Sequence, residues 1–363
     1  MPAAKTLSTL RTYASFVKLS HTVFALPFAL AGMAAAYAVP TGFLYILPSP
    51  DGMPSYPGSF DQHIPFSWHV LVLILCCMVG ARSFAMALNR ILDRRIDALN
   101  PRTARRELPS GKLSVVAAWV FAALSAVVYF TACWLLGDVV FALSPIPILL
   151  MAAYPLMKRF TALCHLGLGA ALGFAPVGAW VAVRGCATDT VARTGANTVY
   201  SRLNLVGEWR AWDGLGWGAV GELAPWVLGA AVMLWVAGFD IIYALQDDEF
   251  DRANKLHSIP ARFGRKAALW ISRAMHAASA ACFFGFILLL TNPAPFGGMD
   301  TRQFTEIAQW VWAAPCVMLA GMIWQHSLVR HNDLSRVNMA FFAVNGVISL
   351  AFGALFVAAW LLR

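Results

Sequence analysis

The sequence has little charge. Only 12% of its 363 residues are Asp, Glu, Lys or Arg, and 60% are hydrophobic, whereas soluble domains carry about 25% charged residues. Several apolar runs reach the roughly 20 residues that a helix needs to cross a bilayer, so an ordinary soluble protein is excluded. We predict an all-α membrane bundle of about nine transmembrane helices, near residues 21–40, 67–88, 115–136, 139–157, 163–183, 223–245, 266–291, 305–328 and 337–361.

Two other signals are also missing. The seven cysteines show no metal-binding spacing and mostly fall inside apolar runs. We therefore interpret them as small buried residues rather than ligands. The first 20 residues are polar and basic, and no small-residue cleavage site follows them. We therefore expect no cleavable signal peptide.

The positive charge is unevenly placed along the chain. A net charge of +9 would suggest nucleic acid as the partner of a soluble protein, but in a membrane protein its location matters more. We expect the lipid bilayer as partner and no nucleic acid. With the N-terminus in the cytoplasm, 21 of the 27 Lys and Arg fall on the inner side, and the positive-inside rule favours this orientation.

Two outer stretches differ from the rest of the chain. Residues 41–66 contain no Lys or Arg and are rich in Pro, Gly and Ser, and residues 184–222 form the longest polar insert. We interpret both as extracytoplasmic inserts in one transmembrane domain that covers residues 1–363. The three Trp residues between 209 and 217 suit either an interfacial segment or an ordinary connecting loop.

Acidic residues form two short rows, both on the predicted inner side. Asn89, Asp93 and Asp97 recur every four residues, which places them on one face of a helix. The second row follows a later apolar run and predicts another helical stripe, made of Asp240, Tyr243, Asp247 and Asp251. Asp248 and Glu249 fall off this stripe, and we expect them to be solvated.

These rows predict a polar cavity at the membrane surface, because a charged side chain at membrane depth costs about 3 kcal/mol on insertion scales. Hard oxygen ligands without a His–Cys pattern favour Mg²⁺ over zinc. Four converging carboxylates would repel one another strongly, and a metal with a diphosphate resolves that conflict. Seven Lys and Arg between residues 89 and 114 supply positive charge for such a diphosphate.

Three motifs carry a family resemblance. Residues 89–103, NRILDRRIDALNPRT, resemble the first motif of the UbiA family of intramembrane aromatic prenyltransferases, and residues 240–251, DIIYALQDDEFD, resemble its second motif. Residues 154–159, YPLMKR, are similar to the tyrosine and basic pair after the family's fourth helix. Residues 18–22 and 256–260 resemble the subgroup that is like 4-hydroxybenzoate polyprenyltransferase.

The resemblance implies a UbiA-like bundle that transfers a polyprenyl group from its diphosphate to an aromatic acid. It implies that Mg²⁺ ions bridge both motifs to the diphosphate through Asn89, Asp93, Asp97, Asp247 and Asp251. Asn89, Arg102, Arg106 and Lys158 are the candidate diphosphate-binding residues. Asp240, Tyr154, Lys158 and Tyr243 are the candidate catalytic residues: Asp240 orients or deprotonates the phenol, and the two Tyr rings shield the allylic cation.

The acceptor and the reaction class leave alternatives open. The resemblance implies quinone biosynthesis, as ubiquinone or menaquinone, in a bacterial inner membrane with a cytoplasmic active site. The same chemistry on a dihydroxynaphthoate or a haem is an alternative. A transporter is another alternative. Transporters bind their substrates near the membrane midplane, whereas the acids here lie at one membrane side, which argues against this alternative. Arg82, seven residues before Asn89, suits either an acceptor carboxylate or an ion pair. Nothing in the sequence indicates a protein partner.

Overall fold

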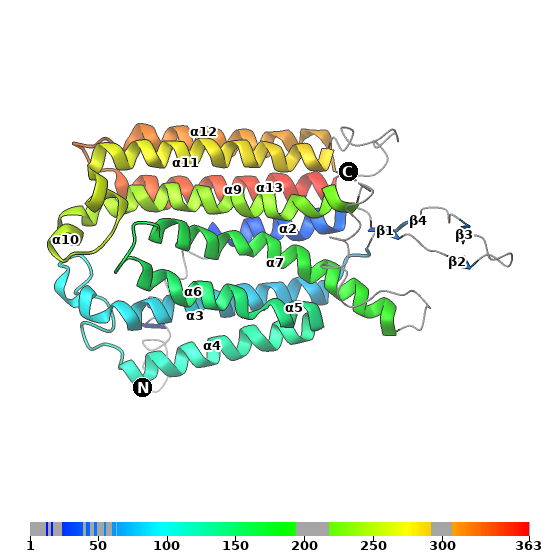
Figure 1. Cartoon of the computed structure of the whole chain (residues 1–363), viewed down its shortest axis with the longest axis horizontal. Coiled ribbons are helices and arrows are strands. Elements are labelled where there is room, and N and C mark those ends of the chain that lie inside the picture. Colours follow the sequence, from blue (N-terminus) through cyan, green and yellow to red (C-terminus); the bar gives the residue numbers. More distant parts are fainter. Residues whose placement is uncertain are drawn as a thin grey trace, which may run out of the picture.

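The computed structural model describes residues 24–38, 64–193, 218–291 and 307–362, together with Thr12, Tyr13, Phe16 and four short strands between residues 41 and 62. The helices are α2 (Leu26–Ala38), α3 (Trp68–Leu99), α4 (Val115–Leu136), α5 (Asp138–Leu143), α6 (Pro145–Met157), α7 (Cys164–Arg193), α9 (Gly218–Ala244), α10 (Asp248–Ala253), α11 (Ile259–Thr291), α12 (Ala313–Leu328) and α13 (Asn345–Leu361). Their long axes run side by side in one bundle (Figure 1).

The all-α prediction is confirmed, and each of the nine predicted spans coincides with helical structure. Seven helical segments in the described part of the chain are long and apolar enough to cross a membrane. The other two spans correspond to α2, with 13 residues, and α12, with 16. Short 3-10 or π turns precede the last two helices, at Gln309–Trp312 and Met339–Val344.

The two predicted inserts lie partly outside the described residues. Within the first, strand β1 (Thr41–Phe43) pairs antiparallel with β4 (Phe60–Gln62), and β2 (Leu47–Pro48) pairs with β3 (Pro54–Ser55). In the second, α7 continues to Arg193 and α9 begins at Gly218. The Trp residues at 209, 212 and 217 lie outside the described residues, so their predicted role stays a prediction.

The helices begin and end where the sequence supplies caps. The hydroxyl of Ser67 accepts a hydrogen bond from the Val70 amide at the start of α3, and Ser114 does the same for Ala117 at the start of α4. Such N-caps satisfy backbone donors that have no partner within the helix. At the other end of α3, Asn100 is the C-cap in an extended conformation, as expected for a residue before a proline.

The core combines close helix packing with clustered aromatic rings. A Cβ added to Gly173 of α7 would lie 2.5 Å from the Gly229 carbonyl of α9, so glycine lets these two backbones approach closely. Around α9, Phe28 is in ring contact with Trp235 and with Phe352 of α13. Of the cysteines described, Cys133 and Cys164 are buried as expected, whereas Cys316 is exposed.

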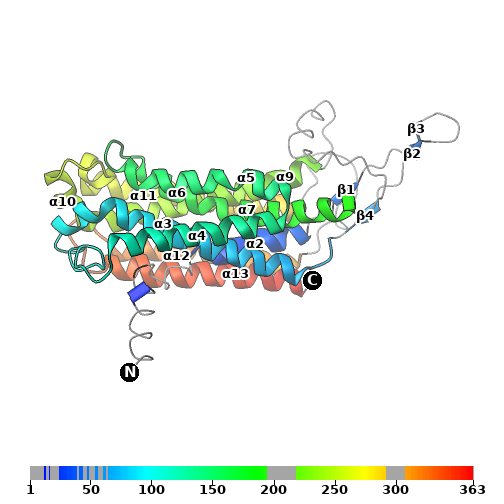
Figure 2. The ribbon, with the colours of Figure 1, turned by 90° about the horizontal axis from the view of Figure 1, so that it is seen from below.

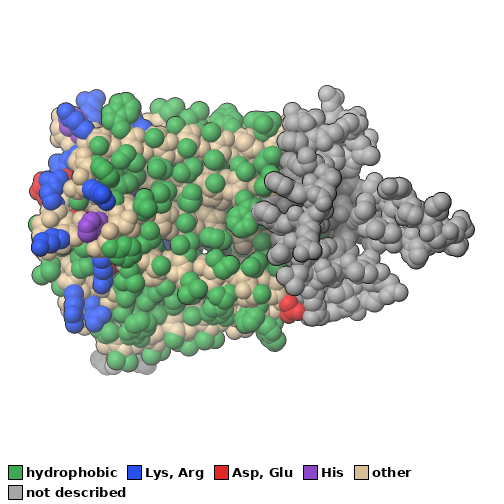
Figure 3. All heavy atoms as spheres, viewed as in Figure 1, with side chains coloured by type: hydrophobic (Ala, Val, Ile, Leu, Met, Phe, Trp, Pro, Cys, Tyr) green, Lys and Arg blue, Asp and Glu red, His purple; other side chains and the backbone are tan. Residues whose placement is uncertain are grey.

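The molecular surface is divided into an apolar band and a charged end. Hydrophobic side chains cover the middle of the bundle, and Lys and Arg side chains gather at the end that holds α10 (Figure 3). The loop between α3 and α4, residues 100–114, lies at the same end in both ribbon views (Figures 1 and 2). We call this the basic end. The band matches the apolar surface that a multi-pass membrane protein presents to lipid.

Candidate active site

The first acidic row lies on the last three turns of α3, and the following loop folds back beneath it. The Thr103 hydroxyl donates a hydrogen bond to the Asp97 carbonyl at 2.9 Å, and the Thr103 amide donates to the Asn100 carbonyl. Gly111 has a φ of 73°, a left-handed conformation that suits glycine, and it turns the loop toward α4. The loop therefore holds its own arginines against the row that precedes it.

The second row is interrupted, which corrects the prediction of one continuous stripe. Helix α9 ends at Ala244, residues Leu245–Asp247 form a 3-10 turn, and α10 begins at Asp248. A 3-10 turn has three residues per turn instead of 3.6, so it shifts the direction of every later side chain. Asp247 and Asp251 are nevertheless both buried.

Asp248 is also buried, so the prediction that it is solvated was wrong. Its two carboxylate oxygens accept hydrogen bonds of 2.8 Å each from Nε and Nη2 of Arg265 on α11. This bidentate pair satisfies a carboxylate that has left water. Glu249 is exposed as expected, with 84% of its side chain accessible.

Arg102 joins the two acidic rows. Its Nε donates to Oδ1 of Asp247 at 2.9 Å, its Nη2 pairs with the other carboxylate oxygen, and its Nη1 donates to the Tyr243 hydroxyl at 2.7 Å. Asn100 adds a 3.1 Å hydrogen bond from its Nδ2 to the same carboxylate. Burial opposes the charge of the Arg102 guanidinium, but the hydrogen bonds and charges of Asp247 and Tyr243 outweigh it and raise its pKa. Arg102 is therefore a permanent cation between the rows.

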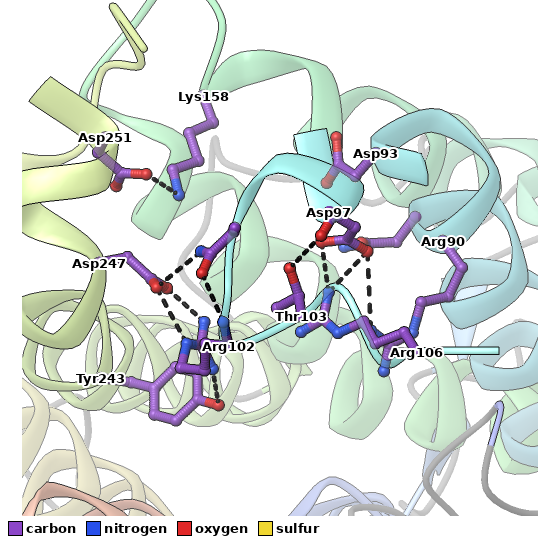
Figure 4. A network of polar contacts seen from close by, with 12 residues as sticks. Arg90, Asp93, Asp97, Arg102, Thr103, Arg106, Lys158, Tyr243, Asp247 and Asp251 are labelled. Carbon is purple, nitrogen blue, oxygen red and sulfur yellow. Dashed lines mark hydrogen bonds and ion pairs between the residues drawn. The ribbon is translucent and has the colours of Figure 1, made fainter. Parts of the chain in front are cut away.

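Each predicted metal-ligating carboxylate faces a cation. Arg106 donates to both oxygens of Asp97 at 2.7 and 2.8 Å. Lys158 pairs with Asp251 at 2.7 Å, and Arg102 pairs with Asp247 (Figure 4). Arg159 pairs with Asp93 at 3.5 Å. Each of these carboxylates therefore has a partner of opposite charge, which offsets the repulsion among the four acids.

The donor chemistry of these residues fits Mg²⁺, although their present arrangement is one of ion pairs. Among the described residues, no three His, Cys, Asp or Glu side chains lie together as a metal-binding group. Asp251 is 0% exposed, and neither of its oxygens accepts a hydrogen bond of normal geometry despite the nearby Lys158. A buried carboxylate with unused lone pairs can take a hard cation.

A second set of contacts lies deeper along α3 and α6. The Asn89 amide donates a 2.7 Å hydrogen bond to the Tyr154 hydroxyl. Three charged side chains (Arg82, Asp93 and Asp240) lie close enough to act electrostatically on that hydroxyl. The Nε of Arg82 is buried and has no hydrogen-bond partner in the part of the chain that the structure describes. An unpartnered buried donor of this kind is available to a substrate anion.

Asp240 does not contact the other acids of its row; it pairs with His165, which the sequence analysis did not single out. The Ile259 amide donates to Nε2 of His165 at 3.3 Å, so this nitrogen is the acceptor. Nδ1 therefore carries the proton and donates to Asp240 at 2.7 Å. The signal was an ionisable residue within an apolar run, which in a membrane segment indicates a functional site.

The fold and the site together define a helical integral membrane enzyme. The family model of the UbiA prenyltransferase family matches residues 58–347, and the chain belongs to this family. The motifs predicted that the chain is a prenyltransferase of the UbiA family, and this prediction is therefore confirmed.

Curated relatives and solved structures agree with this assignment. The chain is 26% identical over 293 residues to a 4-hydroxybenzoate octaprenyltransferase of Tolumonas auensis, covering 80% of this chain and 85% of the relative. Another of that name, from Vibrio vulnificus, is 28% identical over 81% of this chain and 86% of the relative.

The apo structure of a UbiA homolog from Aeropyrum pernix K1 has a TM-score of 0.63 and 29% identity, covering 94% of this chain and 97% of that one. A homolog from Archaeoglobus fulgidus bound to DMAPP and Mg²⁺ has a TM-score of 0.59 at 15% identity, covering 97% and 100%. That likeness shows the fold alone.

Proposed function

We propose that this enzyme transfers a polyprenyl group from a polyprenyl diphosphate to the ring of a hydroxylated aromatic acid resembling 4-hydroxybenzoate, with Mg²⁺ as cofactor. Such a product belongs to quinone biosynthesis. The names of the relatives support the acceptor. The contact of Arg102 with Asp247 carries the proposal, because it joins the two acidic rows in one site.

The chain forms one domain that lies in a bacterial inner membrane, with the basic end in the cytoplasm. The gathering of Lys and Arg at this end supports the orientation, because the positive-inside rule places such residues in cytoplasmic loops. Donor diphosphate and aromatic acid then reach the site from the cytoplasm. The described parts of the two inserts, strands β1–β4 and the end of α7, lie at the other end of the bundle (Figure 1), and we assign the inserts no part in the chemistry.

The ion pairs of the site exchange partners when substrate binds. The carboxylates of Asp93, Asp97, Asp247 and Asp251, with the Asn89 amide oxygen, would hold Mg²⁺. Arg102, Arg106 and Lys158 turn to the oxygens of the diphosphate, for which guanidinium and ammonium groups are matched donors. In this exchange the carboxylates would keep a positive partner in the metal, and the Arg and Lys side chains would keep a negative partner in the diphosphate. When bound, Mg²⁺ stabilises the negative charge of the departing diphosphate.

The deeper residues serve the organic part of the reaction. The carbon–oxygen bond of the donor breaks, and the rings of Tyr154 and Tyr243 lie beside the allylic cation that forms. The ring carbon ortho to the phenol hydroxyl attacks this cation, and the proton of that carbon then passes to a basic oxygen of the site, either the Asp240 carboxylate or the released diphosphate. Asp240, held by His165, orients the phenol or accepts its proton. The free Nε–H of Arg82 binds the acceptor carboxylate.

One assay tests the proposal. Purified protein is incubated with a polyprenyl diphosphate, Mg²⁺ and a panel of phenolic acids that includes a dihydroxynaphthoate, and the products are analysed by mass spectrometry. The proposal predicts a ring-prenylated 4-hydroxybenzoate and no product in EDTA. Preference for the dihydroxynaphthoate would keep the reaction and change the acceptor. Full activity in EDTA would refute the metal role.

A further inference from the structure

A second polar cavity lies at the basic end, away from the acidic rows. It has a volume of about 650 Å³ and lies between α11, α12 and the loop that follows α12. None of the candidate active-site residues lines it. In Figure 1, α11 and α12 lie on the side of the bundle opposite α3 and α4. The cavity is therefore a separate site, and its chemistry can be considered independently of prenyl transfer.

The lining is rich in positive charge. Lys266, Trp270 and Arg273 occupy one face of α11, and Arg330 with His331 closes the cavity from the loop. No Asp or Glu is among the lining residues. Lys266 and Arg273 form no ion pair with any residue that the structure describes. Cations without carboxylate partners in a concave site suit a phosphate group.

Trp270 gives the cavity the character of a membrane interface. Its ring is 68% exposed, and the Arg273 guanidinium carbon lies 4.8 Å from the centroid of the ring. Trp is enriched at the headgroup level of bilayers, because one part of its ring is apolar and another is polar. This pairing of ring and guanidinium places the cations of the cavity at that level.

An apolar stripe leads from the cavity along the outside of α12. Ser327 lines the cavity, and the exposed side chains of Ile323 and Leu319 lie one and two turns away on the same face. A ligand with acyl chains would lay them along this stripe and keep its phosphate among the cations. A free phosphate ion would gain nothing from the stripe.

A buried hydrogen-bond acceptor belongs to His326, one of the residues that line the cavity. The Trp235 carbonyl can only accept, so Nε2 of His276 donates to it, at 3.1 Å. A histidine that donates through Nε2 alone accepts at Nδ1, so Nδ1 of His276 accepts from Nε2 of His326 at 3.0 Å. This leaves Nδ1 of His326 as an acceptor, and it has no partner among the described residues. A hydroxyl group beside the phosphate would complete it.

We propose that this cavity binds the phosphate of an anionic phospholipid headgroup, in the leaflet at the basic end. Three features carry the proposal: cations without acidic partners, an interfacial Trp, and an exposed apolar stripe that continues from the cavity. A headgroup with hydroxyls, such as that of phosphatidylglycerol, matches the free acceptor of His326. Basic pockets between transmembrane helices are suited to anionic headgroups in general.

Native mass spectrometry of the full-length protein in detergent tests the proposal. Phosphatidylglycerol, phosphatidylcholine and inorganic phosphate are titrated separately. We expect selective retention of phosphatidylglycerol, and Lys266→Gln and Arg273→Gln each weaken its binding about fivefold, as a single basic residue near the membrane surface does. The matched control is Arg262→Gln, which removes an exposed cation of α11 that lies outside the cavity and leaves binding unchanged.

Further arms keep the test decisive. Arg273→Lys retains the charge and restores most of the binding, which separates loss of the site from loss of the fold. Equal binding of phosphatidylcholine, or equal weakening by Arg262→Gln, would overturn the proposal. Displacement of phosphatidylglycerol by millimolar inorganic phosphate would also overturn it, because the site would then be one for free anions.

Discussion

The two acidic rows reach the same end of the bundle through different local structures. The first lies on one continuous helix, α3, which ends at an Asn–Pro pair. The second crosses a 3-10 turn between α9 and α10. In the first row, a regular four-residue spacing aligns the polar side chains. In the second, the turn directs two adjacent carboxylates to different partners.

Because of this difference, two neighbouring acids of the second segment have different roles: one belongs to the active site and the other stabilises the fold. Asp247 contacts Arg102 and so belongs to the site that both rows share. Asp248, the next residue, is held by Arg265 of α11 and fixes the start of α10. A regular helix would have placed these neighbours about 100° apart on one cylinder. The 3-10 turn gives each acid a separate environment, and variants at the two positions should therefore behave differently.

The largest effect is expected from removing one acid of either row. Asp93→Ala or Asp247→Ala lowers the rate of prenyl transfer by at least about 10³-fold, because electrostatic stabilisation of the leaving diphosphate is lost. Initial rates measured with purified protein test this. Each variant still inserts in the membrane and elutes as the wild type does. A rate within tenfold of wild type for either variant would show that its row is dispensable.

A smaller effect is expected from the residue that joins the rows. Arg102→Lys lowers the transfer rate about 10²-fold, because an ammonium cannot contact the Asp247 carboxylate and the Tyr243 hydroxyl in the same geometry. Arg105→Lys is the matched control, since Arg105 is exposed on the same loop. Similar transfer rates for both variants would show that the guanidinium of Arg102 is not needed for catalysis.

His165 should affect the acceptor and not the donor. His165→Gln frees Asp240 from its fixed orientation and lowers kcat about tenfold, while the KM for the polyprenyl diphosphate stays unchanged. Steady-state kinetics with each substrate varied in turn separate the two parameters. An equal rise in the donor KM would indicate that His165 acts on the fold of the whole site.

The neighbour of Asp247 should affect stability instead of catalysis. Asp248→Asn removes the buried, bidentate partner of Arg265, which keeps only its 3.1 Å contact with the exposed Glu249, and lowers the free energy of unfolding by about 2 kcal/mol. The rate per folded molecule stays within about twofold. Denaturation in detergent measures the first quantity. The control is Glu249→Gln, which removes the exposed one of the two acids that Arg265 contacts and changes stability by less than about 0.5 kcal/mol. If Asp248→Asn lost activity but kept its stability, Asp248 would be an active-site residue and not a structural one.

Much of the bundle was predictable, because the apolar runs are long and the bilayer sets their length. Asn89, Asp93 and Asp97 were predictable as one face, since α3 is regular. The break at Leu245–Asp247 was not, because no Gly or Pro marks it in the sequence. Its cause is tertiary: Asp247 and Asp248 have their partners on different elements.

Contacts between residues that are far apart in the chain could not be predicted from the sequence either. His165 and Asp240 are 75 residues apart, and Arg102 and Asp247 are 145 apart. Composition and spacing indicated that both acids belong to a polar site, but not which cation or histidine each one meets. The pairing depends on how α7 and α9 pack and on how the loop after α3 folds back.

The central claim is that both rows hold one Mg²⁺–diphosphate group between them. Calorimetric titration with a non-reactive polyprenyl diphosphate analogue tests it most directly, in wild type, Asp93→Asn, Asp247→Asn and the double variant, with and without Mg²⁺. The account predicts Mg²⁺-dependent binding that each single variant largely abolishes, with little further loss in the double variant. Binding losses that simply add, or binding that is the same without Mg²⁺, would contradict it.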